Sequence, residues 1–162
     1  MDNNEFIEKI KRINKIKSSD EAFILYPAEE EEHKGELNSY VADDSEAYNA
    51  TYSIGDIVFV KEYKYKNGRK KKNHLFVIVG EDNLVVPIEY FGMLISSKIS
   101  KVKYTSNKLL NKDNINKLHT DSIVKTDIIY KINPRAIAFK IGKVDKNKIE
   151  EYRESYLNLN NT

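Results

Sequence analysis

The sequence contains no cysteine and no tryptophan, and it has only six glycines and three prolines in 162 residues. Without cysteine, disulfide bonds, thiolate metal sites and a cysteine nucleophile are excluded. No stretch of about 18 apolar residues occurs, so we expect no membrane-spanning helix. The N-terminal residues Met1 to Phe6 lack the basic and apolar segments of a secretory signal, which favours a cytoplasmic protein.

Charge is nearly balanced overall, at +2, but it is unevenly distributed along the chain. Residues 20–46 contain ten acidic side chains and one lysine, whereas residues 47–162 contain 21 basic and 12 acidic side chains. A basic body behind an acidic segment favours a polyanionic partner for the body, although surface lysine is common in soluble proteins generally.

The apolar pattern divides the chain near residue 50. Apolar residues recur at helical spacing through residues 3–17, at Phe6, Ile7, Ile10, Ile13 and Ile16. This spacing predicts an amphipathic helix, which either packs on its own domain or binds a partner. We therefore expect an N-terminal extension over residues 1–50, with this helix and an acidic segment, and a domain over residues 51–162.

Within residues 51–162 the apolar period is that of strands. The pattern predicts an Asn67-Gly68 hairpin turn and strands over residues 57–66, 74–79, 84–88, 93–97, 99–104 and 122–132. Residues 106–119 have near-helical spacing, and residues 136–139 are expected to form one helical turn.

A final helix is expected after Asp145, which is placed to cap it. Its apolar side is predicted to comprise Ile149, Tyr152, Tyr156 and Leu159. The fold class is therefore α+β, mainly β: a small, strongly curved, partly open barrel of antiparallel strands with a C-terminal helix and a helical N-terminal extension.

The predicted hairpin over Lys61–Lys72 carries seven basic residues and one acidic residue. Lysine and arginine neutralise phosphates and tyrosine rings stack on unpaired bases, so this hairpin is a candidate surface for single-stranded nucleic acid. A solvated hairpin tip without a ligand is the alternative. The nucleic-acid-binding candidates are Lys64, Tyr65, Lys66, Lys70 and Lys71.

His74 is the best acid–base candidate, because histidine exchanges protons near pH 7 and this one directly follows the basic hairpin. A structural histidine at the start of a buried strand is the alternative. His33 lies in the acidic segment and His119 lies just before a strand. The three histidines have no metal-ligand spacing, and no phosphate loop or dinucleotide fingerprint is present, so we expect neither a metal nor a cofactor.

Four segments lead to the final helix in a recognisable order: Ser53–Val60, Asn73–Val79, Thr120–Ile132 and Lys140–Asp145. Over residues 51–157 this order resembles the MazF/PemK family of toxin endoribonucleases. The resemblance implies an SH3-like barrel that forms a homodimer. It also implies a cytoplasmic toxin that cleaves single-stranded RNA without a metal and is neutralised by an antitoxin protein.

In that family an arginine just before the second strand takes part in RNA cleavage. Here Asn73-His74 stands in place of the usual Arg-Pro pair. The resemblance therefore assigns charge stabilisation to Lys72 and Arg69, with His74 as the acid or base.

The family also uses a serine or threonine after the third strand. Ser96 and Ser97 are the matching positions here, as donors of a hydrogen bond to phosphate. In another alignment of this segment with the family, Glu89 and Tyr90 occupy the position of that serine or threonine.

Lysine does not form the bidentate hydrogen bonds to phosphate that arginine forms, so other functions remain possible for this chain. One is a non-catalytic module on the same barrel that binds nucleic acid or protein, such as a phage- or plasmid-related regulator. Another makes the helix within residues 1–17 the working surface for a protein partner. Under the nuclease hypothesis, the acidic residues 20–46 are expected to lie across the basic groove and limit access of RNA.

Overall fold

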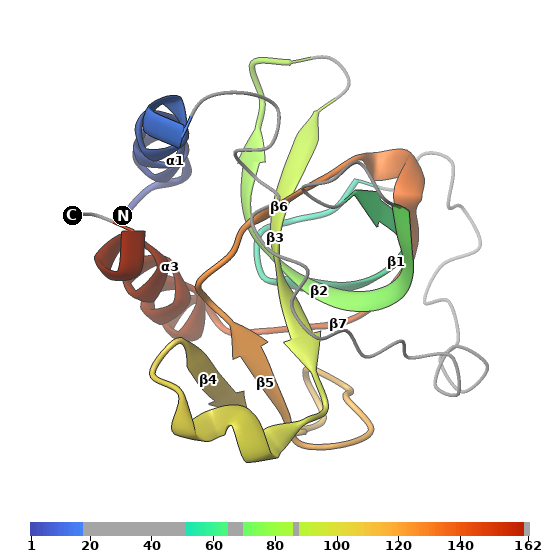
Figure 1. The fold of residues 1–162 in the computed structure, drawn as a ribbon. Coiled ribbons are helices and arrows are strands. Elements are labelled where there is room, and N and C mark those ends of the chain that lie inside the picture. Colours follow the sequence, from blue (N-terminus) through green and yellow to red (C-terminus); the bar gives the residue numbers. More distant parts are fainter. Residues whose placement is uncertain (18–50, 65–69, 86–87, 161–162) are drawn as a thin grey trace.

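The computed structural model describes residues 1–17, 51–64, 70–85 and 88–160 (Figure 1). In chain order the helices and strands are α1 (Asn3–Lys17), β1 (Asp56–Lys64), β2 (Lys70–Asp82), β3 (Glu89–Ser96), η2 (a 3-10 helix, Ile99–Lys103), β4 (Asn107–Leu110), β5 (Ser122–Lys125), β6 (Tyr130–Ile132), η3 (a 3-10 helix, Pro134–Ala136), β7 (Ile137–Lys143) and α3 (Lys146–Asn160). The acidic residues 20–46 lie outside the described residues.

The described strands form one antiparallel sheet of seven strands, in the order β4-β5-β3-β2-β1-β7, with β6 paired to β3. The sheet is strongly curved and its two ends do not close (Figure 1). The predicted fold class, a mainly β, partly open barrel with a helix at each end of the chain, is therefore confirmed.

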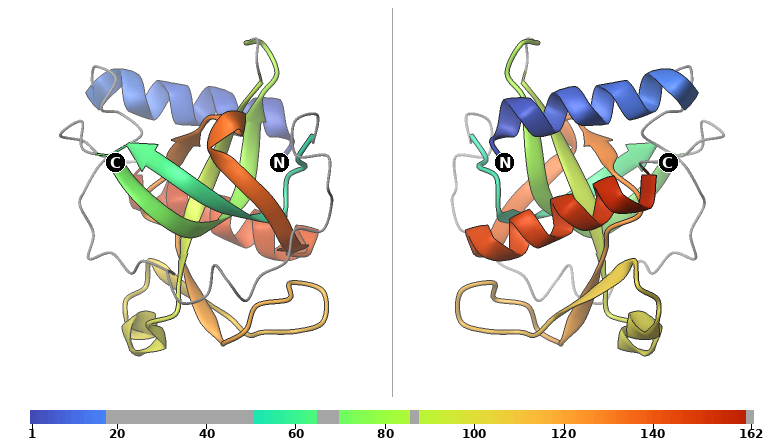
Figure 2. Two further views of the ribbon diagram at one scale, coloured as in Figure 1. Left: turned by 90° about the vertical axis from the view of Figure 1, so that its right-hand side faces the viewer. Right: turned by 90° about the vertical axis from the view of Figure 1, so that its left-hand side faces the viewer.

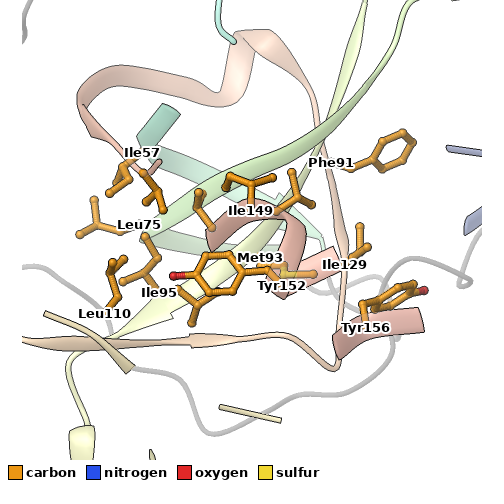
Figure 3. Packing of buried hydrophobic residues seen from close by; sticks show 14 of the residues in the cluster. Ile57, Leu75, Phe91, Met93, Ile95, Leu110, Ile129, Ile149, Tyr152 and Tyr156 are labelled. Carbon is orange, nitrogen blue, oxygen red and sulfur yellow. The ribbon is translucent and has the colours of Figure 1, made fainter. Parts of the chain in front are cut away.

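Both faces of the central strands are buried. Side chains alternate along each strand, so Val77 faces one apolar cluster while its neighbours Phe76 and Ile78 face the other. The first cluster lies between the sheet and the helices (Figure 3), and the second lines the opposite, concave face. This burial explains the uninterrupted apolar run over residues 75–79.

Helix α3 begins as the sequence predicts. The Asp145 side chain accepts hydrogen bonds from the backbone N–H groups of Asn147 (2.8 Å) and Lys148 (3.1 Å), which caps the helix. Ile149, Tyr152 and Tyr156 are buried as expected. The prediction for Leu159 was wrong, because its side chain is exposed near the end of the helix.

Helix α1 packs on its own domain, which confirms the first of the two readings. Phe6 and Ile10 are fully buried in the same cluster as Phe91 and Tyr156. The two helices lie on the same side of the sheet (Figure 2). No described helix has the length and apolar character needed to cross a membrane.

Polar contacts fix the position of α1 along β2. The Asn3 side chain exchanges two hydrogen bonds with the Glu81 backbone, at 2.8 and 2.9 Å. Lys11 forms an ion pair of 2.8 Å with the buried Asp82 carboxylate. The Arg153 guanidinium of α3 donates to the carbonyl oxygens of Val79 and Met1, each at 2.8 Å, so one side chain joins both helices to the sheet.

Several predicted elements were wrong. Of the strand expected over residues 84–88, the described residues 84, 85 and 88 lie outside any strand, in the turn after β2 and just before β3, and Leu84 is exposed. Residues 99–104 contain the 3-10 helix η2, and residues 106–119 contain β4. The helical turn expected over residues 136–139 ends at Ala136, and β7 follows directly. The long strand over residues 122–132 is split into β5 and β6.

Candidate functional site

The basic hairpin is formed by β1 and β2, which pair from Ile57–Val77 to Lys64–Lys70. Lys72 is exposed and lies opposite Glu62. Of the predicted nucleic-acid-binding residues, Lys64, Lys70 and Lys71 belong to the paired strands. Tyr65, Lys66 and the predicted site residue Arg69 lie outside the described residues.

The backbone takes an unusual turn at the position where the family resemblance expects arginine. Asn73 has a φ of 61°, in the left-handed region that residues other than glycine seldom adopt. Asparagine tolerates this conformation better than most residues. It lies between the exposed Lys72 and the buried His74, so the two predicted site residues have very different surroundings.

His74 is fully buried, with 0% of its surface exposed. Its ring lies in edge contact with Tyr63, at a centroid separation of 5.6 Å. Tyr63 also packs edge-on against Phe76 (5.1 Å) and Tyr130 (5.5 Å). His74 thus belongs to a cluster of aromatic rings at the base of the hairpin, and its ring is inaccessible to solvent in this arrangement.

The two predicted hydroxyl residues lie at the end of β3. Ser96 is 1% exposed, and its Oγ accepts a hydrogen bond from the backbone N–H of Lys98 at 3.2 Å. Ser97 is partly exposed. The alternative residues Glu89 and Tyr90 start β3, at the opposite end of the strand, and Tyr90 is buried.

Strand register brings buried polar side chains to one face of the sheet. Ser96 pairs with Ile123, and side chains of paired residues lie on the same face. Lys125 follows Ile123 by two residues on β5, so it shares that face and is 8% exposed. His74 is also on this face, since Phe76, two residues later on β2, pairs with Leu94, two residues before Ser96. The structure thus unites His74 and Ser96 on one face and adds Lys125.

The segment between β5 and β6 brings further polar residues close to Lys125 in the chain. Between the Ile95–Val124 and Gly92–Tyr130 pairs, β3 advances three residues while the partner chain advances six. The additional residues form a bulge that begins at Thr126. Bulges redirect side chains and are frequent next to active sites.

Thr126 anchors this bulge. Its Oγ1 donates to the Ser106 carbonyl oxygen at 2.6 Å and lies 2.6 Å from the Ser155 Oγ on α3. Because the one hydroxyl proton of Thr126 is directed at the Ser106 carbonyl, Ser155 is the donor of the second bond. These bonds fix the bulge to the turn before β4 and to the C-terminal helix.

Asp127 follows in the bulge and has a perturbed carboxyl group. Burial raises the pKa of Asp127, and this effect outweighs the backbone hydrogen bond and the positive charge of Lys125, which lower it. A half-buried acid with a raised pKa, beside a buried lysine, is a typical feature of sites that transfer protons. Among the described residues, no three side chains of histidine, cysteine, aspartate or glutamate gather as a metal site.

Sequence reasoning missed Lys125 and Asp127 because it placed both in a long regular strand. The signal in the sequence was the polar triplet Lys125-Thr126-Asp127 within an otherwise apolar stretch. A polar triplet cannot alternate between two buried faces without burying a charge, so it indicates a break in the strand.

Comparison with known proteins gives the family of the chain. Residues 53–156 match the family model described as the PemK-like, MazF-like toxin of type II toxin–antitoxin systems. No curated protein matches the chain. The matched residues run from just before β1 to near the end of α3, and they include Ser96, Lys125 and Asp127. Because the match covers well over half of its length, the chain belongs to the PemK-like, MazF-like toxin family.

Proposed function

We propose that the protein is a toxin that cleaves single-stranded RNA without a metal ion and is neutralised by a cognate antitoxin. One observation carries the proposal: the strand ends bring Ser96 and Lys125 to one face, next to a carboxyl group with a raised pKa. Family membership supports the toxin role and an antitoxin partner. The basic hairpin supports a polyanionic substrate.

The proposed reaction is an internal transfer at one phosphodiester. The 2′-oxygen of a ribose attacks the adjacent phosphorus and loses its proton, and a 2′,3′-cyclic phosphate forms. The bond from phosphorus to the 5′-oxygen of the next nucleotide breaks, and that oxygen takes up a proton. Such a reaction needs a base, an acid and stabilisation of negative charge on the phosphate oxygens.

The residues divide these tasks by charge and exposure. Asp127 is the proposed proton-transfer group, because its half-buried carboxyl group lies near the positive charge of Lys125 and burial raises its pKa. Lys125 stabilises negative charge, and Ser97, or Ser96 after a small shift, donates a hydrogen bond to the phosphate. Lys72 contacts the RNA backbone from the exposed side of the hairpin.

His74 has a structural role in the proposal, because its ring is buried, and a catalytic role only if it becomes accessible. In the present arrangement it supports Tyr63 and the base of the hairpin. If Tyr63 moves when RNA binds, His74 becomes available as the acid or base that the sequence suggests. Arg69 and the hairpin residues Tyr65 and Lys66 remain proposed RNA contacts.

A homodimer and a cytoplasmic location belong to the same proposal, since both follow from the family resemblance. A non-catalytic RNA-binding module on the same barrel is the second candidate. The observation that favours it is the absence of arginine before β2, where Asn73 stands, together with the burial of His74. Both candidate functions predict that the protein binds RNA, but only the nuclease is expected to cleave it.

Cleavage of a long, mostly unpaired RNA by the purified protein in EDTA tests the proposal. We expect cutting by the parent and a loss of about a hundredfold to ten-thousandfold with Asp127→Asn, in line with removal of one acid–base group. Ser97→Ala and His74→Asn are measured alongside. The matched control is Glu154→Gln, which changes an exposed carboxyl group of α3 and is expected to leave the rate unchanged.

RNA binding without cutting by the parent would exclude the nuclease and favour the binding module. Cutting that survives Asp127→Asn would retain the nuclease and remove Asp127 from its site. Circular dichroism of each variant separates loss of a functional group from loss of folding.

A further inference from the structure

A cavity of about 540 Å³ lies between the N-terminal residues, the segment just before β1 and the first half of α3. Figure 2 shows the N-terminus beside this part of α3, and an ion pair of 3.0 Å joins Met1 to Glu150 there. Cavities of this volume hold small organic molecules. Residues 1–3, which line it, precede the family-matched residues 53–156, so the cavity needs the N-terminal extension as well as the toxin domain.

The cavity and the candidate site lie on opposite faces of the sheet. Val144 and Ile149, which line the cavity, belong to the apolar cluster between the sheet and the helices. His74 and Ser96 lie on the other face, with the residues of the concave cluster. A ligand in the cavity therefore does not contact the candidate site.

Arg153 supplies a buried positive charge to the lining of the cavity. Its side chain is 4% exposed, and its guanidinium carbon lies 4.8 Å from the centre of the Phe6 ring. Its Nε–H donates to the Val79 carbonyl oxygen, and Nη1 donates to Met1 and Glu150. Nη2 forms no hydrogen bond with the part of the chain that the structure describes, so its two N–H groups can serve an acceptor in the cavity.

Neighbouring carboxylates compensate the charge of Arg153 incompletely. Burial lowers the pKa of Arg153, and this effect outweighs Glu150 and Asp2, which raise it. The Glu150 carboxylate is also shared, because one oxygen accepts from Arg153 at 3.1 Å and the other from the Met1 ammonium group at 3.0 Å. Lys146 adds an exposed cation to the lining. An additional anion in the cavity is therefore electrostatically favoured.

Three aliphatic side chains, those of Ile54, Val144 and Ile149, also line the cavity. Their positions are fixed by the backbone, since the Val144 N–H donates to the Gly55 carbonyl oxygen at 2.8 Å. Gly55 has a φ of 99°, and a Cβ atom there would lie 2.9 Å from the Val144 carbonyl oxygen, so only glycine suits this contact. The apolar part of the cavity is thus formed before any ligand binds, which lowers the entropic cost of binding.

We propose that this cavity binds a small organic anion, with its carboxylate or phosphate group at Arg153 and its apolar body against Ile54, Val144 and Ile149. Lys146 lies two turns before Arg153 on the same side of α3, so it also attracts the anion. A neutral molecule of the same shape gains only the apolar contact, and a small anion without an apolar body gains only the charge. Both are therefore expected to bind more weakly.

The test titrates the full, isotope-labelled chain at constant ionic strength with four probes, and it follows the backbone amide signals by NMR. Phenylpropanoate and phenyl phosphate carry both an anionic group and an apolar body, phenylpropanol lacks the charge, and acetate lacks the body. We expect a Kd of about 1 mM or tighter for at least one aromatic anion, and binding at least about tenfold weaker for phenylpropanol and acetate. The tighter aromatic anion identifies the preferred head group. Shifted signals are expected to include Asn3, Ile54 and Glu150.

Variants test the two cations of the lining separately. Arg153→Gln is expected to reduce binding of the aromatic anion to that of phenylpropanol, and circular dichroism checks its folding, because Arg153 also joins both helices to the sheet. Lys146→Glu changes an exposed side chain and is expected to weaken anion binding at least about threefold. The matched control is Lys143→Glu, an exposed lysine of β7 outside the lining, which is expected to leave binding unchanged.

The proposal is overturned by no binding of either aromatic anion up to about 10 mM, or by equal binding of the aromatic anions and phenylpropanol. Shifts confined to residues 97–112 or to the β1–β2 hairpin, or unchanged binding in Lys146→Glu, also overturn it. Binding that needs both the charge and the apolar body, and that falls in Lys146→Glu but not in Lys143→Glu, supports the cavity even if Arg153→Gln does not fold. RNA cleavage is not part of this test, so its result is independent of the proposed function.

Discussion

At the scale of single residues, the candidate site depends on where polar side chains are buried. Lys125 and Ser96 are nearly inaccessible, and the pKa of Asp127 is raised by burial. Buried polar and charged groups cost folding free energy, so a protein retains them mainly where they serve its structure or its chemistry. Asp127 therefore offers a direct test of whether this region was shaped for function.

Replacing Asp127 with asparagine is expected to separate stability from activity. The pKa of Asp127 is raised in the folded state, so the folded protein binds this proton more tightly than the unfolded chain does. Folding stability from this group is thus fully present below the unfolded pKa of about 3.9, and it is lost as pH rises through the folded pKa. Asp127→Asn is expected to abolish that loss.

Urea denaturation at several pH values between 3 and 8 measures this effect. The parent is expected to lose stability relative to the variant as pH rises. A parent that gains stability over the variant across the same range would show that the carboxylate is stabilised in the folded state and would contradict the raised pKa.

At the scale of helices and strands, α1 is an integral part of the domain. It contributes fully buried residues to the main cluster, and Arg153 connects the carbonyl group of Met1, just before the helix, to Val79 of β2. The Met1 ammonium group also pairs with Glu150 of α3 at 3.0 Å. These contacts oppose the reading in which residues 1–17 can be removed without loss of the folded barrel.

Phe6→Ala is expected to lower the free energy of unfolding by about 3–5 kcal/mol, as for other buried phenylalanines. Phe6 is completely buried, and its ring contacts Tyr156 edge-on at a centroid separation of 6.5 Å. Glu8→Ala, on the exposed side of α1, is the control and is expected to change stability by less than about 0.5 kcal/mol. Equal, small effects of the two substitutions would mean that α1 does not pack on the domain in solution.

The strengths and failures of sequence reasoning also appear at this scale. The apolar run over residues 75–79 and the capping residue Asp145 are local signals, and both predictions were correct. The split of residues 122–132 depends on contacts between distant parts of the chain, namely the bonds of Thr126 to Ser106 and Ser155. Local periodicity cannot encode such contacts, so Lys125 and Asp127 were not singled out.

The residues of the face shared by His74 and Ser96 could be anticipated in part, because the proton chemistry of histidine singled out His74 and the family resemblance selected Ser96. The burial of His74 could not, because its ring packs against Tyr63, which comes from another strand. The left-handed backbone at Asn73 was equally hidden, although asparagine is one of the few residues suited to it.

At the scale of the whole molecule, two segments next to the candidate residues are rich in basic side chains. One is the β1–β2 hairpin, which leads into His74, and the other is residues 97–112, which follow Ser96 and contain five lysines and no acidic residue. Family membership, the basic segments and the buried polar face together favour RNA as the substrate and a protein as the inhibitor. The central claim is therefore chemical: the 2′-hydroxyl of the RNA is the nucleophile.

The most direct measurement compares two oligonucleotides in EDTA that differ only in one 2′-hydroxyl at the mapped cleavage position. The account predicts that the all-ribose strand is cut there to leave a 2′,3′-cyclic phosphate, and that the strand with a single 2′-deoxyribose is not cut at that position. Cutting of both strands at the same position, with a 5′-phosphate on the product, would contradict it.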